Sequence, residues 1–217
     1  MRITLPSGTP AELAQAPNAA LGLVIAPDIG GLRPLFDDMC ARLCADEGLT
    51  TCAVEPFPGR EALTLEERLN GGVASLDDAR QLADLVAAAD ATACDTVAVA
   101  GFCMGGMYAM KAAGTGRFSR AVSFYGMVHV PEQFTGPGQG QPLDYLARPG
   151  ACPVLAIVGG KDPWIAPEHV PELEAAGVTV AFYPEAEHGF VHDPDRPAHR
   201  PDDAADAWGR ALAFIRG

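Results

Sequence analysis

A cysteine stands in a glycine-rich turn near the middle of the chain. The sequence reads GFCMGG over 101–106, directly after the apolar run 95–102 and directly before a helical pattern. In a tight strand-to-helix turn of this kind, Gly101 and Gly105 avoid a collision with the strand and the helix. The turn lifts the Cys103 side chain clear of the sheet, and the helix start favours a thiolate. Cys103 is therefore a candidate nucleophile; the alternative is a packed cysteine in a glycine-rich turn.

An acid and a histidine follow Cys103 along the chain. Asp162 comes directly after the apolar run 153–160, and His188 follows the run 178–184. Enzymes with a nucleophile on such a turn place an acid and then a histidine downstream, each in a loop after a strand. The histidine takes the proton of the thiol, the acid fixes the histidine tautomer, and the backbone N–H of Met104 faces the developing oxyanion. A lone Asp or His is more often a solvated loop residue, but the three groups in this order favour a site.

Such groups need a scaffold that brings the ends of several strands to one edge. Short apolar runs rich in β-branched residues alternate with helical patterns, which predicts a mostly parallel central sheet with helices on both faces. We expect one α/β domain over residues 1–217, with Asp162 and His188 at the carboxyl ends of strands, where open α/β sheets build their sites. The predicted strands are 21–27, 50–56, 95–102, 120–126, 153–160 and 178–184.

Local signals give some helix boundaries and one long loop. Ser75 with Asp78 resembles a capping box for the helix that follows. Asp202 or Asp203 is placed to cap the last helix. The segment 127–150 is rich in glycine and proline, and it reads as a long loop that could serve as a lid.

Composition excludes several function classes. The chain has 217 residues and a net charge of −13, from 28 acidic and 15 basic residues. This balance argues against nucleic acid or an anionic membrane as a partner. No apolar run is long enough to span a bilayer, and the N-terminal MRITLPSGTP has no apolar signal region, so a cytoplasmic location is the default. Six cysteines form neither a zinc-site spacing nor a disulfide framework. We expect neither a metal nor a cofactor.

The chain resembles the dienelactone hydrolase (carboxymethylenebutenolidase) family of the α/β-hydrolases. The matching motifs cover about residues 20 to 216: GFCMGG, SFYG, GGKDPW, EHGFVHDPDRP and the helix AADAWGRALAFI. The resemblance implies an α/β-hydrolase fold with Cys103 as nucleophile, His188 as base and Asp162 as the orienting acid. It also implies that the backbone N–H of Ile29 is the second oxyanion donor.

Two positions near these motifs differ from the family pattern. Where well-known members carry a glutamate that contacts the resting thiol, this chain has Asp28; it either modulates the thiol or begins a turn before the next helix, and the two readings carry equal weight. Where those members have an arginine that grips the carboxylate of the lactone, this chain has His192. Aromatic side chains at strand ends could line an apolar pocket, although each one alone is more readily explained as core. They are Phe57, Tyr125, Trp164 and Phe190.

The leading hypothesis is a cofactor-independent hydrolase of small esters or lactones that acts through a Cys103–His188–Asp162 triad and a thioester. A second hypothesis is a non-catalytic protein that binds a ligand in the same pocket. A third is a redox-active thiol at Cys103, which gives Asp162 and His188 no role. We expect either a monomer or a homodimer.

Overall fold

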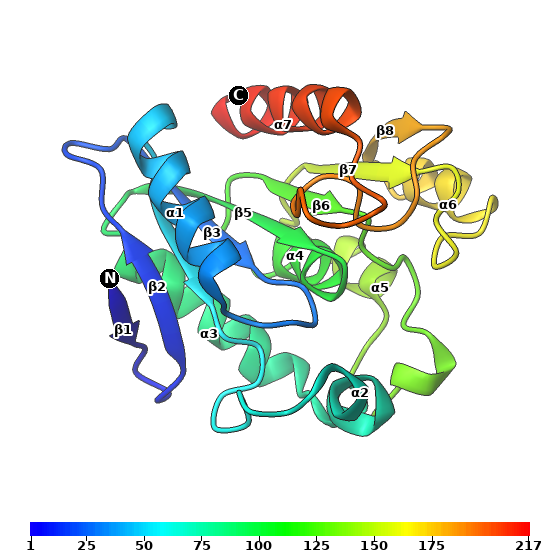
Figure 1. Ribbon diagram of the computed structural model, residues 1–217, viewed down its shortest axis with the longest axis horizontal. Helices are drawn as coiled ribbons and strands as arrows, with labels where there is room; N and C mark the ends of the chain where they lie inside the picture. Colours follow the sequence, from blue (N-terminus) through cyan, green and yellow to red (C-terminus); the bar gives the residue numbers. More distant parts are fainter.

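The computed structural model describes all 217 residues, and one eight-stranded sheet runs through it in the order β1-β2-β4-β3-β5-β6-β7-β8 (Figure 1). The six strands from β3 onward are parallel to one another. These six match the strands predicted from the apolar runs, and the mostly parallel α/β fold is confirmed. The strands are β1 (Arg2–Thr4), β2 (Pro10–Ala14), β3 (Leu21–Ala26), β4 (Thr50–Val54), β5 (Thr96–Phe102), β6 (Ala121–Phe124), β7 (Val154–Gly159) and β8 (Thr179–Tyr183).

Two antiparallel strands at the N-terminus were not predicted. β2 pairs with β4, and β1 extends the sheet by pairing with β2. β1 is short, and β2 is only half-buried, with polar or small residues in place of a continuous apolar run. Edge strands of this kind carry little of the apolar signal that identifies a buried parallel strand.

Helices cover both faces of the sheet. α1 and α7 pack on one face against side chains such as Ile25 and Phe102, whereas α3 and α4 pack on the other against Val24 and Val99. Neighbouring residues of a strand point to opposite faces, so the fully buried strands serve both layers. No helix is both long enough and apolar enough to span a membrane. The helices are α1 (Pro34–Glu47), α2 (Leu65–Glu67), α3 (Asp78–Ala91), α4 (Met104–Ala113), α5 (Pro142–Leu146), α6 (His169–Ala175) and α7 (Pro201–Arg216).

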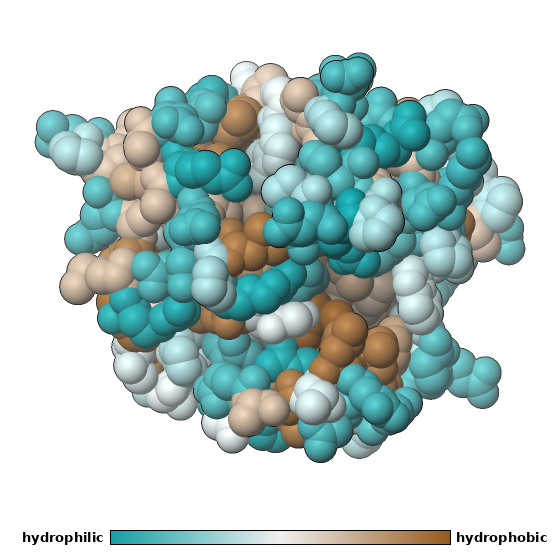
Figure 2. Space-filling model, in the orientation of Figure 1, coloured by the Kyte–Doolittle hydropathy of each residue, from teal (hydrophilic) through white to brown (hydrophobic).

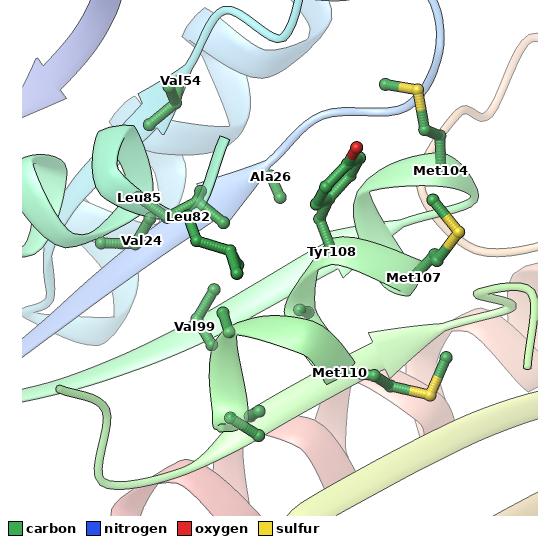
Figure 3. Packing of buried hydrophobic residues seen from close by; sticks show 14 of the residues in the cluster. Val24, Ala26, Val54, Leu82, Leu85, Val99, Met104, Met107, Tyr108 and Met110 are labelled. Atoms are coloured by element: carbon green, nitrogen blue, oxygen red, sulfur yellow. The ribbon is translucent and has the colours of Figure 1, made fainter. Parts of the chain in front are cut away.

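The core under α3 and α4 fixes the helix that follows Cys103. Figure 3 shows Leu82 and Leu85 of α3 beside Val99 of β5, with the α4 side chains Met107 and Tyr108 in the same cluster. Every residue of α4 is buried. The N-terminus of α4 therefore has little freedom to move relative to the sheet.

Both predicted cap assignments are wrong. The N-cap of α3 is Asp77, whose side chain accepts a hydrogen bond from the Arg80 amide, while Ser75 lies in a preceding 3-10 turn. α7 begins at Pro201 with no side-chain cap. Proline suits this position because its missing N–H has no partner in a first helical turn.

The long loop 127–150 contains a 3-10 turn (Glu132–Phe134) and α5. It is bound to the start of α3: Asp78 accepts hydrogen bonds from the Gly140 amide and the Tyr145 hydroxyl at 2.9 Å each. The same carboxylate pairs with the fully buried ammonium of Lys111 at 2.9 Å. One buried ion pair thus ties the loop to both α3 and α4.

Candidate active site

The turn at Cys103 has the strained backbone that its glycines require. Cys103 has φ 57° and ψ −118°, and its half-buried side chain lies between the end of β5 and the start of α4. Positive φ at a non-glycine residue costs free energy and is common at functional sites. A Cβ on Gly101 would lie 2.0 Å from the Gly105 carbonyl oxygen, and one on Gly105 would lie 2.0 Å from the Ala26 carbonyl oxygen. The steric reason expected for both glycines is therefore present.

His188 and Asp162 meet at the same edge of the sheet. Asp162 follows β7 and is buried, and its Oδ2 lies 2.8 Å from Nδ1 of His188, which follows β8. The other ring nitrogen of His188, Nε2, is buried and has no regular hydrogen-bond partner. Cys103 and His188 line one pocket. Catalytic hydrogen bonds are often loose before substrate binds, and Nε2 is the ring nitrogen of His188 that is left for proton transfer.

The charge state of His188 depends on its two neighbours. Burial alone would lower the pKa of His188, but hydrogen bonds and negative charge from Asp162 and Cys103 outweigh it and raise the pKa to about 9. The imidazolium form of His188 is favoured by this balance.

Two backbone amides are available for an oxyanion. Met104 is the first residue of α4, where helix N–H groups lack intrahelical partners. The N–H of Ile29, in the turn after β3, donates to no protein atom. Both residues line the pocket beside Cys103. Ile29 and Met104, whose amides are predicted to be the oxyanion donors, therefore line the same pocket as the predicted nucleophile.

The pocket has a volume of about 420 Å³, and nine of its fifteen lining residues are hydrophobic. That size and character suit a small organic substrate. Leu65 and Leu69 at its edge are among the few exposed large hydrophobic residues of the chain. Figure 2 shows apolar residues (brown) gathered above α2 beside a hollow. The remaining lining residues include Asp28, Gly30, Arg33, Val73, Met127, Phe134, Trp164, Asp193 and Arg196.

Of the predicted aromatic residues, only Trp164 lines this pocket. Phe57, Tyr125 and Phe190 are fully buried and belong to the core, as the alternative reading held for each. His192 is also buried and lies behind the pocket. It cannot grip a substrate carboxylate from there.

Asp28 and His192 are bound to each other. Nε2 of His192 lies 2.8 Å from Oδ2 of Asp28, and Nδ1 of His192 is hydrogen-bonded to the Tyr125 hydroxyl. Asp28 also forms a bidentate ion pair with Arg33 at 2.6 and 2.8 Å. Burial would raise the pKa of Asp28, but hydrogen bonds from His192 and Arg33 outweigh it and hold that pKa well below its usual range. Asp28 is therefore an anchored carboxylate.

Sequence reasoning missed several lining residues. Arg33 immediately precedes the proline that opens α1, and its spacing of five residues from Asp28 could have suggested the pair. Leu65 and Leu69 lie in α2 and the π-helical turn Arg68–Gly72, a segment without a clear helical or strand pattern. Arg196 lies against Gly189, and no local signal marked it.

No group of three or more His, Cys, Asp or Glu residues is arranged to hold a metal ion. The site offers a thiol, an imidazole, a carboxylate and two backbone N–H groups. This set is able to attack and stabilise a carbonyl centre.

Comparisons with known proteins identify the family of the chain. The model of the dienelactone hydrolase family matches residues 10–217. A Bradyrhizobium protein described as a probable 2-oxo-3-(5-oxofuran-2-ylidene)propanoate lactonase is 31% identical over 208 residues, covering 89% of this chain and 82% of that protein. The carboxymethylenebutenolidase of Rhodococcus opacus is 27% identical over 216 residues, covering 89% of this chain and 79% of its own length.

A solved structure extends the similarity to the whole fold. The crystal structure of a protein from Klebsiella pneumoniae, described as a candidate dienelactone hydrolase, matches with a TM-score of 0.86 and 27% identity, over 100% of this chain and 97% of that one. The resemblance seen in the motifs is thus confirmed by sequence and by structure. Because the family model covers nearly the full chain, the protein belongs to the dienelactone hydrolase family of ester and lactone hydrolases with the α/β-hydrolase fold.

Proposed function

We propose that the protein hydrolyses small esters or lactones through a thioester on Cys103, with His188 as base and Asp162 as the residue that orients it. The observation that carries the proposal is the position of His188: its Nδ1 lies 2.8 Å from Oδ2 of Asp162, and His188 and Cys103 line the same pocket. Asp162 fixes the tautomer and stabilises the imidazolium.

In the acylation half, the proton of the Cys103 thiol passes to Nε2 of His188, and the sulfur forms a bond to the carbonyl carbon of the substrate. The carbonyl electrons move to oxygen, and the amides of Ile29 and Met104 stabilise that oxyanion. When the tetrahedral intermediate collapses, the carbon–oxygen bond to the alcohol breaks and His188 gives its proton to the alkoxide. In a lactone, the released hydroxyl stays attached to the acyl group.

In the deacylation half, His188 accepts a proton from water, and the oxygen of that water attacks the thioester carbon. The second oxyanion uses the same two amides. Cleavage of the carbon–sulfur bond releases the carboxylic acid, and the sulfur regains its proton from His188. Each turnover consumes one ester and one water, so no cofactor enters the balance.

The test is hydrolysis of p-nitrophenyl acetate by the native protein and by Cys103→Ala. We expect Cys103→Ala to lose at least the factor of about 10²–10³ associated with one catalytic donor. Mass spectrometry of the native protein, quenched during turnover, should show an acetyl group on Cys103. A matched control is Cys94→Ala, since Cys94 is a free, half-buried thiol that does not line the pocket.

Equal rates for the native protein and Cys103→Ala would refute the proposal and favour ligand binding in an idle pocket. Oxidation of Cys103 by peroxide that is faster than its acylation by any ester would favour the redox alternative.

A further inference from the structure

The turn that contains Ile29 is closed by two hydrogen bonds. Within residues 28–31, the Gly31 amide donates to the Asp28 carbonyl oxygen at 2.9 Å, and the Gly30 amide donates to Oδ1 of Asp28 at 2.8 Å. Asp28 therefore closes the turn twice, with its backbone and with its side chain. The Ile29 N–H, in the same turn, donates to no protein atom.

Asp28 is itself fixed from three other parts of the fold. Arg33, one residue before α1, holds both of its carboxylate oxygens, and His192, beyond β8, holds Oδ2. Tyr125, directly after β6, is hydrogen-bonded to the far ring nitrogen of His192. Both His192 and Tyr125 are buried. Tyr125, His192 and Asp28 thus form a continuous chain of hydrogen bonds that ends at the Asp28 carboxylate.

The tautomer of His192 follows from its two partners. A carboxylate can only accept, so Nε2 of His192 donates to Asp28, and Nδ1 must accept from the Tyr125 hydroxyl. Burial lowers the pKa of His192, which favours the same neutral form. His192 therefore transmits the position of Tyr125 to Asp28 through two directed hydrogen bonds.

We propose that Asp28, held by Arg33, His192 and Tyr125, is a positioning residue that aims the Ile29 amide at the oxyanion, and that it does not act on the Cys103 thiol. All of the hydrogen-bonding contacts of its carboxylate go to Gly30, Arg33 and His192, and none goes to Cys103. The inference rests on the proposed function, because it assigns a role in stabilising an oxyanion formed by that reaction.

The experiment compares two reactions of Cys103 in the same variants. Hydrolysis of p-nitrophenyl acetate passes through an oxyanion, whereas alkylation of the thiol by iodoacetamide does not. For Asp28→Ala we expect kcat to fall by about 10- to 100-fold, part of the effect of a lost oxyanion donor, with KM changed less than about 3-fold. The alkylation rate should stay within about 3-fold of the native value, since Asp28 makes no hydrogen bond to the Cys103 thiol.

Graded variants separate positioning from general damage. Asp28→Asn keeps an acceptor for the Gly30 amide but loses the ion pair, so its kcat should lie between those of the native protein and Asp28→Ala. Tyr125→Phe keeps the ring and removes only the hydroxyl, and it should lower kcat by a few-fold in the same direction. Asp37→Asn is the matched control, because Asp37 is also paired with an arginine, Arg2, but does not line the pocket.

The possible outcomes are distinct. If kcat and the alkylation rate change in parallel in Asp28→Ala, Asp28 acts on the thiol. If kcat does not change, the Ile29 amide is positioned without the help of Asp28. Either result overturns the inference. If Asp28→Ala is less stable, the alkylation rate and the graded Tyr125→Phe variant still report on the folded site. Retained activity in Cys103→Ala would instead refute the proposed function itself.

Discussion

At the scale of single residues, the proton on His188 links catalysis to stability. Its pKa is raised to about 9 because the hydrogen bonds and charges of Asp162 and Cys103 outweigh the opposing effect of burial. A raised pKa means that the folded state binds this proton more tightly than the unfolded chain. The resulting stabilisation is fully present below the ordinary value of 6.5 and is lost as the pH rises through about 9.

We therefore expect the ring of His188 to titrate near pH 9 in the native protein, as followed by NMR of its Cε1 proton. In Cys103→Ala the pKa should be lower, because one of its causes is removed while the Asp162 bond stays. The stability difference between the native protein and His188→Gln, from denaturant unfolding, should shrink between pH 6.5 and 9. A His188 that titrates near 6.5 in the native protein would contradict this.

The residues of the triad could be predicted because their signals are local. A nucleophile turn, an acid after one strand and a histidine after another are each visible within a few residues. The anchors of Asp28 could not be predicted in the same way. Asp28 and His192 are 164 residues apart in sequence, and only the folded sheet shows that the histidine faces the carboxylate and not the pocket.

At the scale of elements, the close approach of α4 to β3 explains why Gly105 is a glycine. A Cβ there would lie 2.0 Å from the backbone oxygen of Ala26, so the helix or the strand end must move. We expect Gly105→Ala to lower the free energy of unfolding by about 1–3 kcal/mol or more, as overpacked sites do. Hydrolysis should fall as well, because the Met104 amide shifts with the helix.

Gly209 is the matched control for this change. It lies in the middle of α7, and a Cβ there would meet nothing within 4 Å. Alanine is favoured over glycine inside a helix, so Gly209→Ala should raise stability by about 0.5–1 kcal/mol. Thermal unfolding of both variants tests the pair; equal effects would mean that helix propensity, and not the contact with Ala26, decides the result.

Helices and strands were predictable where their own apolar pattern is strong. They were not predictable where an element forms because another element offers it a partner. β3 to β7 are largely buried strands and β8 is an edge strand, and all six lie within a few residues of the bounds predicted from their apolar runs. β1 and β2 lack such runs and exist because β4 offers them an edge. The cap of α3 was assigned to the wrong residue because Asp78, which looked like part of a capping box, is used by Lys111 instead.

At the scale of the whole molecule, the parallel strands deliver the site in sequence order to one edge of the sheet. Ile29 follows β3, Cys103 follows β5, Asp162 follows β7 and His188 follows β8. In the sheet β3 lies next to β5 and β7 lies next to β8, and only β6 separates these two pairs. This convergence was predictable from strand–helix alternation. The contacts that hold the loop 127–150 on the other side of the pocket were not.

The position of the loop 127–150 depends on the buried ion pair of Lys111 and Asp78. Met127 and Phe134 of the loop 127–150 line the pocket, and the loop is tied to the protein through Asp78. Burial lowers the pKa of Lys111, and Asp78 opposes this through its hydrogen bonds and charge. Removing one partner of such a pair leaves the other charge buried without compensation, which typically costs about 3–5 kcal/mol.

We therefore expect Lys111→Met to lower the free energy of unfolding by about 3–5 kcal/mol, and the double variant with Asp78→Asn to recover part of that loss, because no buried charge is then left unpaired. Hydrogen exchange of the Gly140 amide should become faster in the double variant, since an amide oxygen is a weaker acceptor than the carboxylate of Asp78. Arg117→Met is the matched control, as Arg117 pairs with the exposed Asp90 and such surface pairs contribute about 0–1 kcal/mol. A double variant no more stable than Lys111→Met would show that the loop 127–150 is held by packing alone.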